Sequence, residues 1–245
     1  MERSMNVILC GANGRMGREI GREIARCSDM DIAAEIDLNA GDGQYKSIAD
    51  FCGSADVIVD FSHRSATVSI VDYAVERSIP LVIATTGQTE EEKEYIKRAS
   101  DKIPIFFCGN MSLGVAVFVS LVAKVAEIFP YADVEIVETH RAGKADVPSG
   151  TALMIADAVL NAMKGGGRIV VGRREGARQK GDIGISSLRI GETVGVHEVR
   201  ISTVYQTITL KHEAHSRALF VAGAMHAIRF IVSESIGLYS VKDFL

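Results

Sequence analysis

The stretch that decides the fold is VILCGANGRMG, residues 7–17. An apolar run leads into glycines spaced GxxGxxG, and a helical pattern follows. A strand that turns through glycines into a helix is typical of the first βαβ unit of a dinucleotide-binding sheet. The glycines let backbone N–H groups approach a pyrophosphate, whose charge a helix N-terminus favours. The first interval departs from GxGxxG, and glycine-rich turns also serve plain strand–helix packing, so both interpretations stay open at this point.

Apolar runs recur through the part of the chain before Ser112, separated by longer amphipathic segments. This alternation predicts successive βα units and a parallel sheet. Continuous aliphatic runs are typical of strands that are buried on both faces. We predict strands at Val7–Cys10, Ile32–Ile36, Val57–Phe61, Leu81–Ala84 and Ile105–Phe107.

The pattern changes beyond Ser112, where long helical segments alternate with β-type sequence. Alternation around Ile208 and Leu210 predicts a sheet with one solvent-facing side. We predict a helix over Leu113–Ile128, a strand over Val134–Thr139, a helix from Thr151 to Met163 ended by Gly165–Gly167, mostly β structure over Arg168–His212, and a last element, a helix, over about Ser216–Ser235.

The composition is that of an ordinary globular protein, with 47% hydrophobic and 24% charged residues. A formal net charge of −4 argues against nucleic acid or an anionic membrane as a partner. The polar start and the lack of long apolar runs predict a cytoplasmic protein. A basic run between Lys164 and Arg189 fits either a solvated loop or an anion-attracting rim of a site.

The four cysteines are scattered, with no CxxC pair and no histidine at metal-ligand spacing. We interpret them as reduced core thiols, and we expect no metal site. They are Cys10, Cys27, Cys52 and Cys108.

Asp37 ends the second predicted strand, about 20 residues beyond Gly17, where a carboxylate accepts ribose hydroxyls. A carboxylate there repels the 2′-phosphate of NADPH, and Leu38 offers no compensating arginine. We therefore expect NADH to be preferred. NADPH stays possible, with Arg15 as a partial compensation.

Later strand ends carry small and hydroxyl residues that suit a nicotinamide ribose, since ligands of open α/β sheets lie beyond the strand carboxyl ends. Each such segment alone is more often a turn than a binding loop, but three in register favour a binding site. The predicted cofactor-binding residues are Gly11, Ala12, Asn13, Gly14, Arg15, Met16, Asp37, Ala84, Thr85, Thr86, Cys108, Gly109, Asn110 and Met111.

The segment richest in chemistry is ETHRAGKADVPSGTA, residues 138–152. A loop with His140, Arg141 and Lys144 runs into Pro-Ser-Gly-Thr at a predicted helix N-terminus, whose N–H groups would bind a carboxylate. Asp146 or Ser149 could serve only to cap that helix. Capping does not explain a histidine and two cations beside it, so we predict an anion-binding catalytic site.

Three motifs resemble the 4-hydroxy-tetrahydrodipicolinate reductase family, and the similarity extends over essentially the whole chain, including the Gly195-x-His197-x-Val199 stretch. The three motifs are Gly-Arg-Met-Gly at residues 14–17, Thr-Thr-Gly at residues 85–87, and HxxxKxDxPSGTA at residues 140–152. The resemblance implies NAD(P)H-dependent reduction of 4-hydroxy-tetrahydrodipicolinate, a small cyclic dicarboxylate, in the diaminopimelate and lysine pathway. It also implies an α/β fold, with an N-terminal Rossmann-type parallel sheet and an inserted α+β domain.

The resemblance assigns residues 1–111 and 216–245 to the dinucleotide-binding domain. Residues 112–215 become the substrate-binding and oligomerisation domain of a homotetramer. His140 would be the general acid/base and Lys144 the proton donor. The implied substrate-binding residues are Arg141, Ser149, Gly150 and Thr151.

Arg141 departs from the family pattern, because many members have a second histidine immediately after the first. Arginine binds a carboxylate bidentately but stays protonated, so this position keeps a binding role and loses any role as a base.

Two other classes of function stay open. An amino-acid dehydrogenase would share the glycine-rich turn and Asp37, but would have no reason to keep His140, Lys144 and the 148–152 run together. A non-catalytic NADH-binding regulator would lose the proton donor, which is present here.

Overall fold

The computed structural model describes residues 4–163 and 166–244, so Lys164 and Gly165 of the predicted basic run and helix stop lie outside the described residues. The chain forms two compact units. One combines the part up to Ser112 with the segment from Ala218 onward, and the other runs from Leu113 to Arg217.

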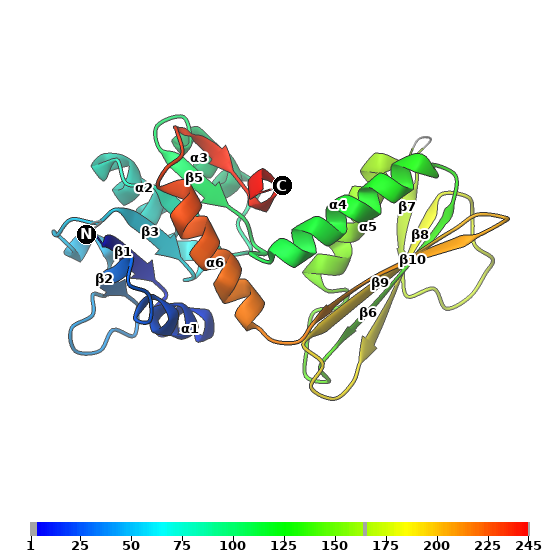
Figure 1. The fold of residues 1–245 in the computed structure, drawn as a ribbon, viewed down its shortest axis with the longest axis horizontal. Coiled ribbons are helices and arrows are strands. Elements are labelled where there is room, and N and C mark those ends of the chain that lie inside the picture. Colours follow the sequence, from blue (N-terminus) through cyan, green and yellow to red (C-terminus); the bar gives the residue numbers. More distant parts are fainter. Residues whose placement is uncertain (1–3, 164–165, 245) are drawn as a thin grey trace. The chain divides into compact units, whose positions relative to one another are not determined.

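The first unit is built on a six-stranded parallel sheet in the order β11-β5-β4-β3-β1-β2 (Figure 1). Its central strands are buried on both faces, and Val7, Ile8 and Leu9 have no exposed surface. The prediction of a parallel α/β sheet is confirmed. The strands are β1 (Met5–Cys10), β2 (Met30–Ile36), β3 (Val57–Asp60), β4 (Leu81–Ile83), β5 (Pro104–Phe107) and β11 (Gly237–Tyr239).

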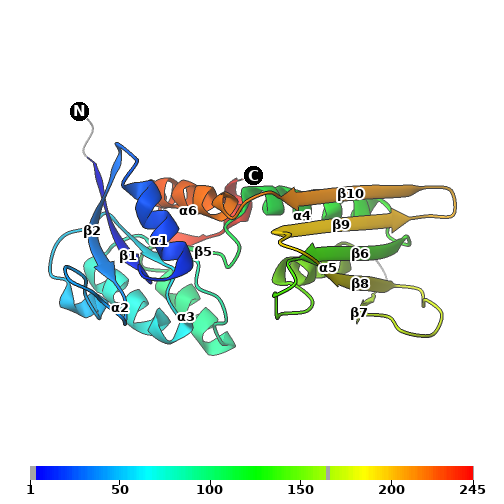
Figure 2. The same ribbon diagram turned by 90° about the horizontal axis from the view of Figure 1, so that it is seen from below.

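Helices cover both faces of this sheet, α1 and α6 on one side and α2 and α3 on the other (Figure 2). Their bounds are α1 (Arg15–Ile24), α2 (Thr67–Arg77), α3 (Glu90–Ala99) and α6 (Ala218–Ile231), with short 3₁₀ helices at Ile48–Asp50, Arg64–Ala66 and Val241–Phe244. In α6, Ala224 and Ile228 are fully buried, which explains the apolar pattern of this last helix.

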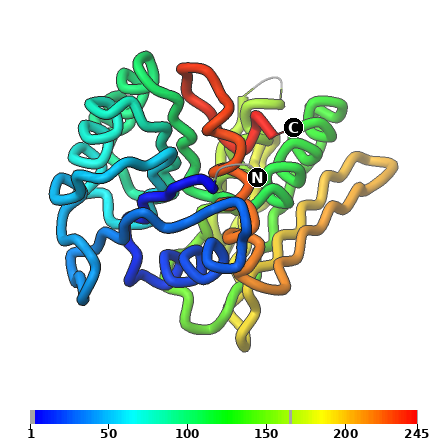
Figure 3. The backbone as a smooth tube through the Cα atoms, turned by 60° about the vertical axis from the view of Figure 1, so that its left-hand side comes forward, coloured from blue at the N-terminus to red at the C-terminus, as the bar shows by residue number. Residues whose placement is uncertain are grey.

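One expectation about the C-terminus was wrong, because α6 is not the last element. The chain continues through β11, which pairs with β5 and adds an edge strand to the sheet, as the orange-to-red end of the tube shows (Figure 3). β11 has only three residues, none of them fully buried. Such a short, half-exposed strand lacks the apolar run by which the buried strands were found.

The second unit packs α4 and α5 against one face of a mixed sheet in the order β10-β9-β6-β8-β7. Fully buried residues of both layers, such as Ile136 and Ile155, form its core. The bounds are α4 (Leu113–Ile128), β6 (Asp133–His140), α5 (Gly150–Ala162), β7 (Arg168–Val171), β8 (Asp182–Arg189), β9 (Gly195–Ser202) and β10 (Thr207–Ala214).

Part of the basic run is structural. Arg168 and Arg173 each lie 2.7 Å from a carboxylate oxygen of Asp182, whose side chain is buried at the start of β8. The hydrogen bond from Arg168 is the largest of the effects that lower the pKa of Asp182. These two arginines therefore compensate a buried charge.

None of the helices in the described ranges combines the length and the apolar character that a membrane-crossing segment requires.

Candidate active site

The glycine-rich loop after β1 is closely packed. Gly11 has a φ of +78°, and a Cβ on it would lie 2.5 Å from the carbonyl oxygen of Phe61. A Cβ on Gly17 would lie 2.1 Å from the carbonyl oxygen of Gly11. Glycine is required at both positions because the loop contacts the segment after β3 and the helix contacts the loop.

We predict that Gly11→Ala destabilises the protein by roughly 2 kcal/mol or more, because it adds a positive-φ strain to a backbone clash. Gly21→Ala is the matched control, since its Cβ would lie 3.6 Å from the nearest side-chain atom, of Leu9. Alanine favours a helix more than glycine does, so this control should unfold at an equal or higher temperature. Thermal unfolding of both variants tests the prediction, and equal stabilities would contradict it.

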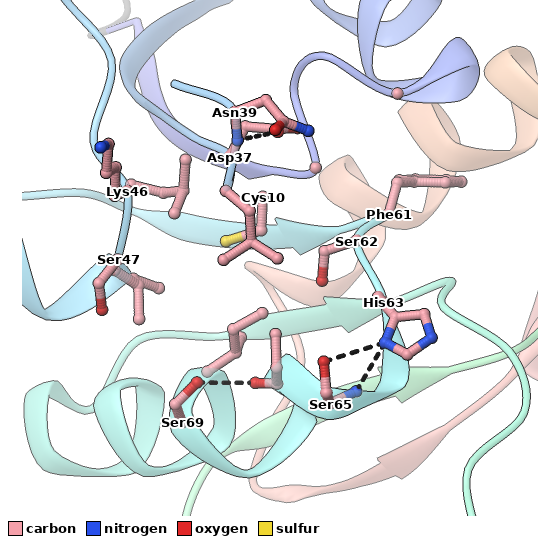
Figure 4. Close-up of a pocket in the computed structure, with 17 residues that line it drawn as sticks. Cys10, Asp37, Asn39, Lys46, Ser47, Phe61, Ser62, His63, Ser65 and Ser69 are labelled. Carbon is pink, nitrogen blue, oxygen red and sulfur yellow. Dashed lines mark hydrogen bonds between the residues drawn. The ribbon is translucent and has the colours of Figure 1, made fainter. Parts of the chain in front are cut away.

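A cavity of about 390 Å³ opens beside this loop (Figure 4). Gly11, Gly14 and Asp37 line it, together with side chains from the segment after β3 and the start of α2, namely Phe61, Ser62, His63, Ser65, Ala66, Ser69 and Ile70. Asp37 accepts hydrogen bonds from the backbone N–H groups of Asn13 (3.0 Å) and Asn39 (2.9 Å). The cavity thus lies beyond the carboxyl ends of β1 and β2 and presents a fixed carboxylate, which fits the adenosine half of a dinucleotide.

The remaining predicted cofactor residues lie further along the same sheet edge. Ala84–Thr86 follow β4 and Cys108–Met111 follow β5. A Cβ on Gly109 would lie 2.8 Å from Cγ2 of Thr86, so these two loops contact each other. These two loops do not line the cavity beside Asp37. Arg15 and Met16 lie at the start of α1 and do not line the cavity either.

The predicted catalytic histidine lies in a buried cluster at the end of β6. His140 Nδ1 is hydrogen-bonded to Glu138 Oε2, and both side chains lie on the face of the sheet that the helices cover. Arg189, at the end of β8, donates to both carboxylate oxygens of Glu138 at 2.9 and 3.1 Å. A Cβ on Gly195 would lie 3.1 Å from His140 Nε2, so a glycine leaves room beside that atom.

Burial and hydrogen bonding act in opposite directions on the charged groups of this cluster. Burial acts to raise the pKa of Glu138, but hydrogen bonds, the one from Arg189 foremost, hold that pKa below its usual value. Burial lowers the pKa of His140, and the Glu138 carboxylate offsets this only in part. Glu138 is therefore ionised and His140 neutral near pH 7, with the ring proton on Nδ1 and a lone pair on Nε2.

A second buried imidazole lies beside the first. The rings of His140 and His197 are 5.3 Å apart in an edge-to-face arrangement. His197 Nε2 lies 3.1 Å from the hydroxyl of Ser149, which also caps α5 by accepting from the N–H of Ala152 at 3.2 Å. Burial, together with the neighbouring His140, lowers the pKa of His197 to about 4.

This shift predicts a loss of stability in mild acid. Because the folded-state pKa of His197 is about 4, the unfolded chain binds the proton first as pH falls below about 6.5. The free energy of unfolding should fall by about 3 kcal/mol between these two pH values. Urea unfolding at neutral pH and near about pH 4.5 measures it. His197→Gln should flatten the dependence, whereas His215→Gln, at an exposed histidine, should not; equal slopes would contradict the prediction.

The predicted cations lie in the loop between β6 and α5. Lys144 Nζ lies 2.8 Å from Asp146 Oδ2, and the Lys144 side chain is 23% exposed. Arg141 is half-buried, and no ion pair joins it to an acid within the described residues. Gly150 and Thr151 form the first turn of α5. The structure thus places every predicted substrate residue between the end of β6 and the start of α5.

Sequence reasoning did not include Glu138 and His197 among the site residues. Glu138 lies in the predicted strand Val134–Thr139, and His140 follows one position beyond its predicted end. Residues at i and i+2 of a strand share a face. That spacing could have revealed the carboxylate. His197 comes from another strand, and no local signal connects it with Ser149. Within the described residues no group of three potential metal ligands is found.

Comparison with known families identifies the chain. The family model described as "Dihydrodipicolinate reductase, N-terminus" matches residues 5–111, and "Dihydrodipicolinate reductase, C-terminus" matches residues 114–245. The 4-hydroxy-tetrahydrodipicolinate reductase of Caldanaerobacter subterraneus subsp. tengcongensis is 38% identical, with 98% of each chain covered. The reductase of the same name from Methanoregula boonei is 35% identical, covering 98% of this chain and 97% of the relative.

Solved structures share the fold. A dipicolinate-bound dihydrodipicolinate reductase from Paenisporosarcina sp. TG-14 matches with a TM-score of 0.83 and 23% identity, covering 99% of this chain and 100% of that one. An amine dehydrogenase from Mycobacterium smegmatis matches with a TM-score of 0.62 and 11% identity over 98% of this chain and 96% of that one. At these identities both likenesses concern the architecture alone.

Proposed function

The chain belongs to the dihydrodipicolinate reductase family, and we propose that it performs the family's reduction with His140 and Lys144 as its proton-transfer groups. Its activity is that of a 4-hydroxy-tetrahydrodipicolinate reductase, a nicotinamide-dependent oxidoreductase of the diaminopimelate and lysine pathway. The observation that carries the residue assignment is the buried Glu138–His140 pair beside the Lys144 loop.

The first unit holds the cofactor in this proposal. When bound, the nicotinamide would supply a hydride to the conjugated imine that forms when the 4-hydroxyl of the substrate leaves as water. The glycine-rich loop and the start of α1 bind the pyrophosphate, Asp37 accepts the ribose hydroxyls, and residues 84–86 and 108–111 hold the nicotinamide end. The Asp37 carboxylate also disfavours the 2′-phosphate of NADPH, which gives a preference for NADH in this proposal.

The second unit supplies the proton-transfer groups in this proposal. Reduction of the imine leaves electron density that must be protonated at the neighbouring carbon, and the Lys144 ammonium is a donor with three protons. Asp146 orients that ammonium in the absence of substrate. His140 exchanges a proton at Nε2, because Nδ1 is engaged by Glu138. Glu138 is thus a positioning residue that fixes the ring and its tautomer.

Binding of a dicarboxylate is supported by charge and geometry. Arg141 offers a planar guanidinium for one carboxylate, and the first turn of α5 at Gly150 and Thr151 offers a helix N-terminus for the other. Dipicolinate, bound to the solved relative, is a ligand of this class. A dehydrogenase with another substrate would not need a histidine, a lysine and this helix start together.

We also propose a homotetramer formed through the sheet of the second unit. α4 and α5 cover one face of this sheet, while Leu188 of β8, on the other face, is 53% exposed. Pairing with a second copy would bury such side chains. Analytical ultracentrifugation tests this assembly, and a monomer at micromolar concentration would contradict it.

The test of the function follows NADH and NADPH oxidation by absorbance. The substrate is generated in situ from pyruvate and aspartate semialdehyde by the preceding enzyme. Rapid oxidation that requires both precursors is the expected result. No turnover with either cofactor would overturn the assignment and favour a regulator or another substrate.

A further inference from the structure

The loop after β2 brings a lysine beside Asp37. Tyr45 pairs with Ile36 in a parallel bridge, with its N–H 2.9 Å from the carbonyl oxygen of Glu35. The N–H of Asp37 in turn donates to the carbonyl oxygen of Tyr45 at 2.9 Å. The chain therefore returns along β2, and Lys46 follows directly on the residue that is bonded to Asp37.

The side chain of Gln44 holds the loop after β2 in this returning conformation. Its Oε1 accepts from the N–H of Gly41 and from Asn13 Nδ2, both at 2.8 Å, and its Nε2 donates to Glu35 at 2.9 Å. Asn13 belongs to the glycine-rich loop. The 41–46 segment is thus tied to the same loop that is proposed to bind the pyrophosphate.

Lys46 lines the cavity together with Asp37 and Ser47 (Figure 4). Lys46 is exposed at the cavity rim, and no ion pair joins it to an acid within the described part of the chain. Glu35 accepts from Gln44, and Asp50 accepts from the N–H of Ser47 at 3.2 Å. The cavity rim at Asp37 therefore carries an uncompensated ammonium.

Ser47 adds a hydroxyl to this rim. Its Oγ accepts from the N–H of Ala49 at 3.3 Å, which leaves its own proton for an outside acceptor. An ammonium and a hydroxyl on consecutive residues are suitable donors for a phosphate group.

We propose that Lys46, assisted by Ser47, determines cofactor specificity by binding the 2′-phosphate of NADPH, so that the chain accepts NADPH as well as NADH. The inference rests on the proposed use of this cavity for the adenosine half of the cofactor. It places the cation eight positions beyond Leu38 in sequence, at the point where the loop returns to Asp37. Arg15, the other candidate, is exposed at the start of α1 and does not line the cavity.

The test measures binding of 2′,5′-ADP and of 5′-AMP to the full-length protein by calorimetry, without turnover. The wild-type protein should bind both 2′,5′-ADP and 5′-AMP. Lys46→Gln should weaken 2′,5′-ADP binding and raise the KM for NADPH by about tenfold or more, with 5′-AMP binding and the KM for NADH changed by less than about twofold. Lys46→Arg should retain binding. Lys102→Gln removes the same charge from an exposed site elsewhere in this unit and is the control.

The outcomes separate this inference from the function on which it rests. Equal 2′,5′-ADP affinities for the wild type and Lys46→Gln, with NADH oxidation intact, overturn the role of Lys46 alone. Failure of both nucleotides to bind, together with no NADH oxidation, overturns the proposed cofactor site and the inference with it. Loss of 2′,5′-ADP binding in Lys102→Gln as well would attribute the effect to net charge and also contradict the proposal.

Discussion

Lys144→Ala is expected to lower kcat by about 10²- to 10⁴-fold, the range typical for removing a positioned proton donor. The ammonium lies 2.8 Å from Asp146 and is only 23% exposed, in the loop that joins the histidine strand to α5. Alanine removes both the proton and the positive charge that stabilises the developing anion. The KM for NADH should change little, because this residue lies in the unit to which no cofactor residue is assigned.

Steady-state NADH oxidation with saturating substrate measures the effect. Lys124→Ala is the matched control, because Lys124 also forms a 2.8 Å ion pair, with Glu127, in the same unit but on α4. Its kcat should stay within about twofold of the wild type, since an exposed pair contributes little to stability. A Lys144→Ala enzyme with near-normal kcat would remove this residue from the mechanism.

Local sequence was sufficient to predict most of the fold. Continuous aliphatic runs such as Val57–Val59 identified the buried strands because both of their faces require apolar side chains. Ser149 was correctly considered as a helix cap, since Pro-Ser-Gly-Thr is a local signal. β11 was missed because an edge strand of three residues is stabilised by its pairing with β5, and its own composition is not diagnostic.

The candidate site was only partly predictable. His140 and Lys144 stand in one polar segment, so their proximity could be predicted without knowledge of the fold. Arg189 contacts Glu138 across 51 positions of sequence, and Ser149 contacts His197 across 48. Such pairs depend on strand order, which no local pattern encodes. Lys46 illustrates the same limit, because sequence reasoning considered only Leu38 and Arg15 as partners of the 2′-phosphate, whereas the Ile36–Tyr45 bridge brings Lys46 back toward Asp37.

His140→Asn is expected to lower kcat by about 10²- to 10⁴-fold as well. Asparagine keeps a donor near the position of Nδ1, so Glu138 retains a hydrogen-bond partner and the cluster should stay folded. It lacks Nε2, the atom at which we propose proton exchange. A normal thermal unfolding temperature, measured beside the loss of kcat, separates this chemical effect from misfolding. Activity close to that of the wild type would contradict the assignment.

Glu138→Gln isolates the positioning role from the chemical one. The variant keeps an acceptor for Arg189 but presents an amide N–H to Nδ1, which favours the wrong tautomer and places the ring proton on Nε2. It also removes the negative charge that partly offsets the lowering of the His140 pKa by burial. We therefore expect kcat to fall by roughly 10- to 10²-fold, and the pKa assigned to His140 in the pH profile to move to lower pH. A purely structural role for Glu138 would reduce the amount of active enzyme without moving that pKa, so an unshifted profile would show that Glu138 does not act through His140.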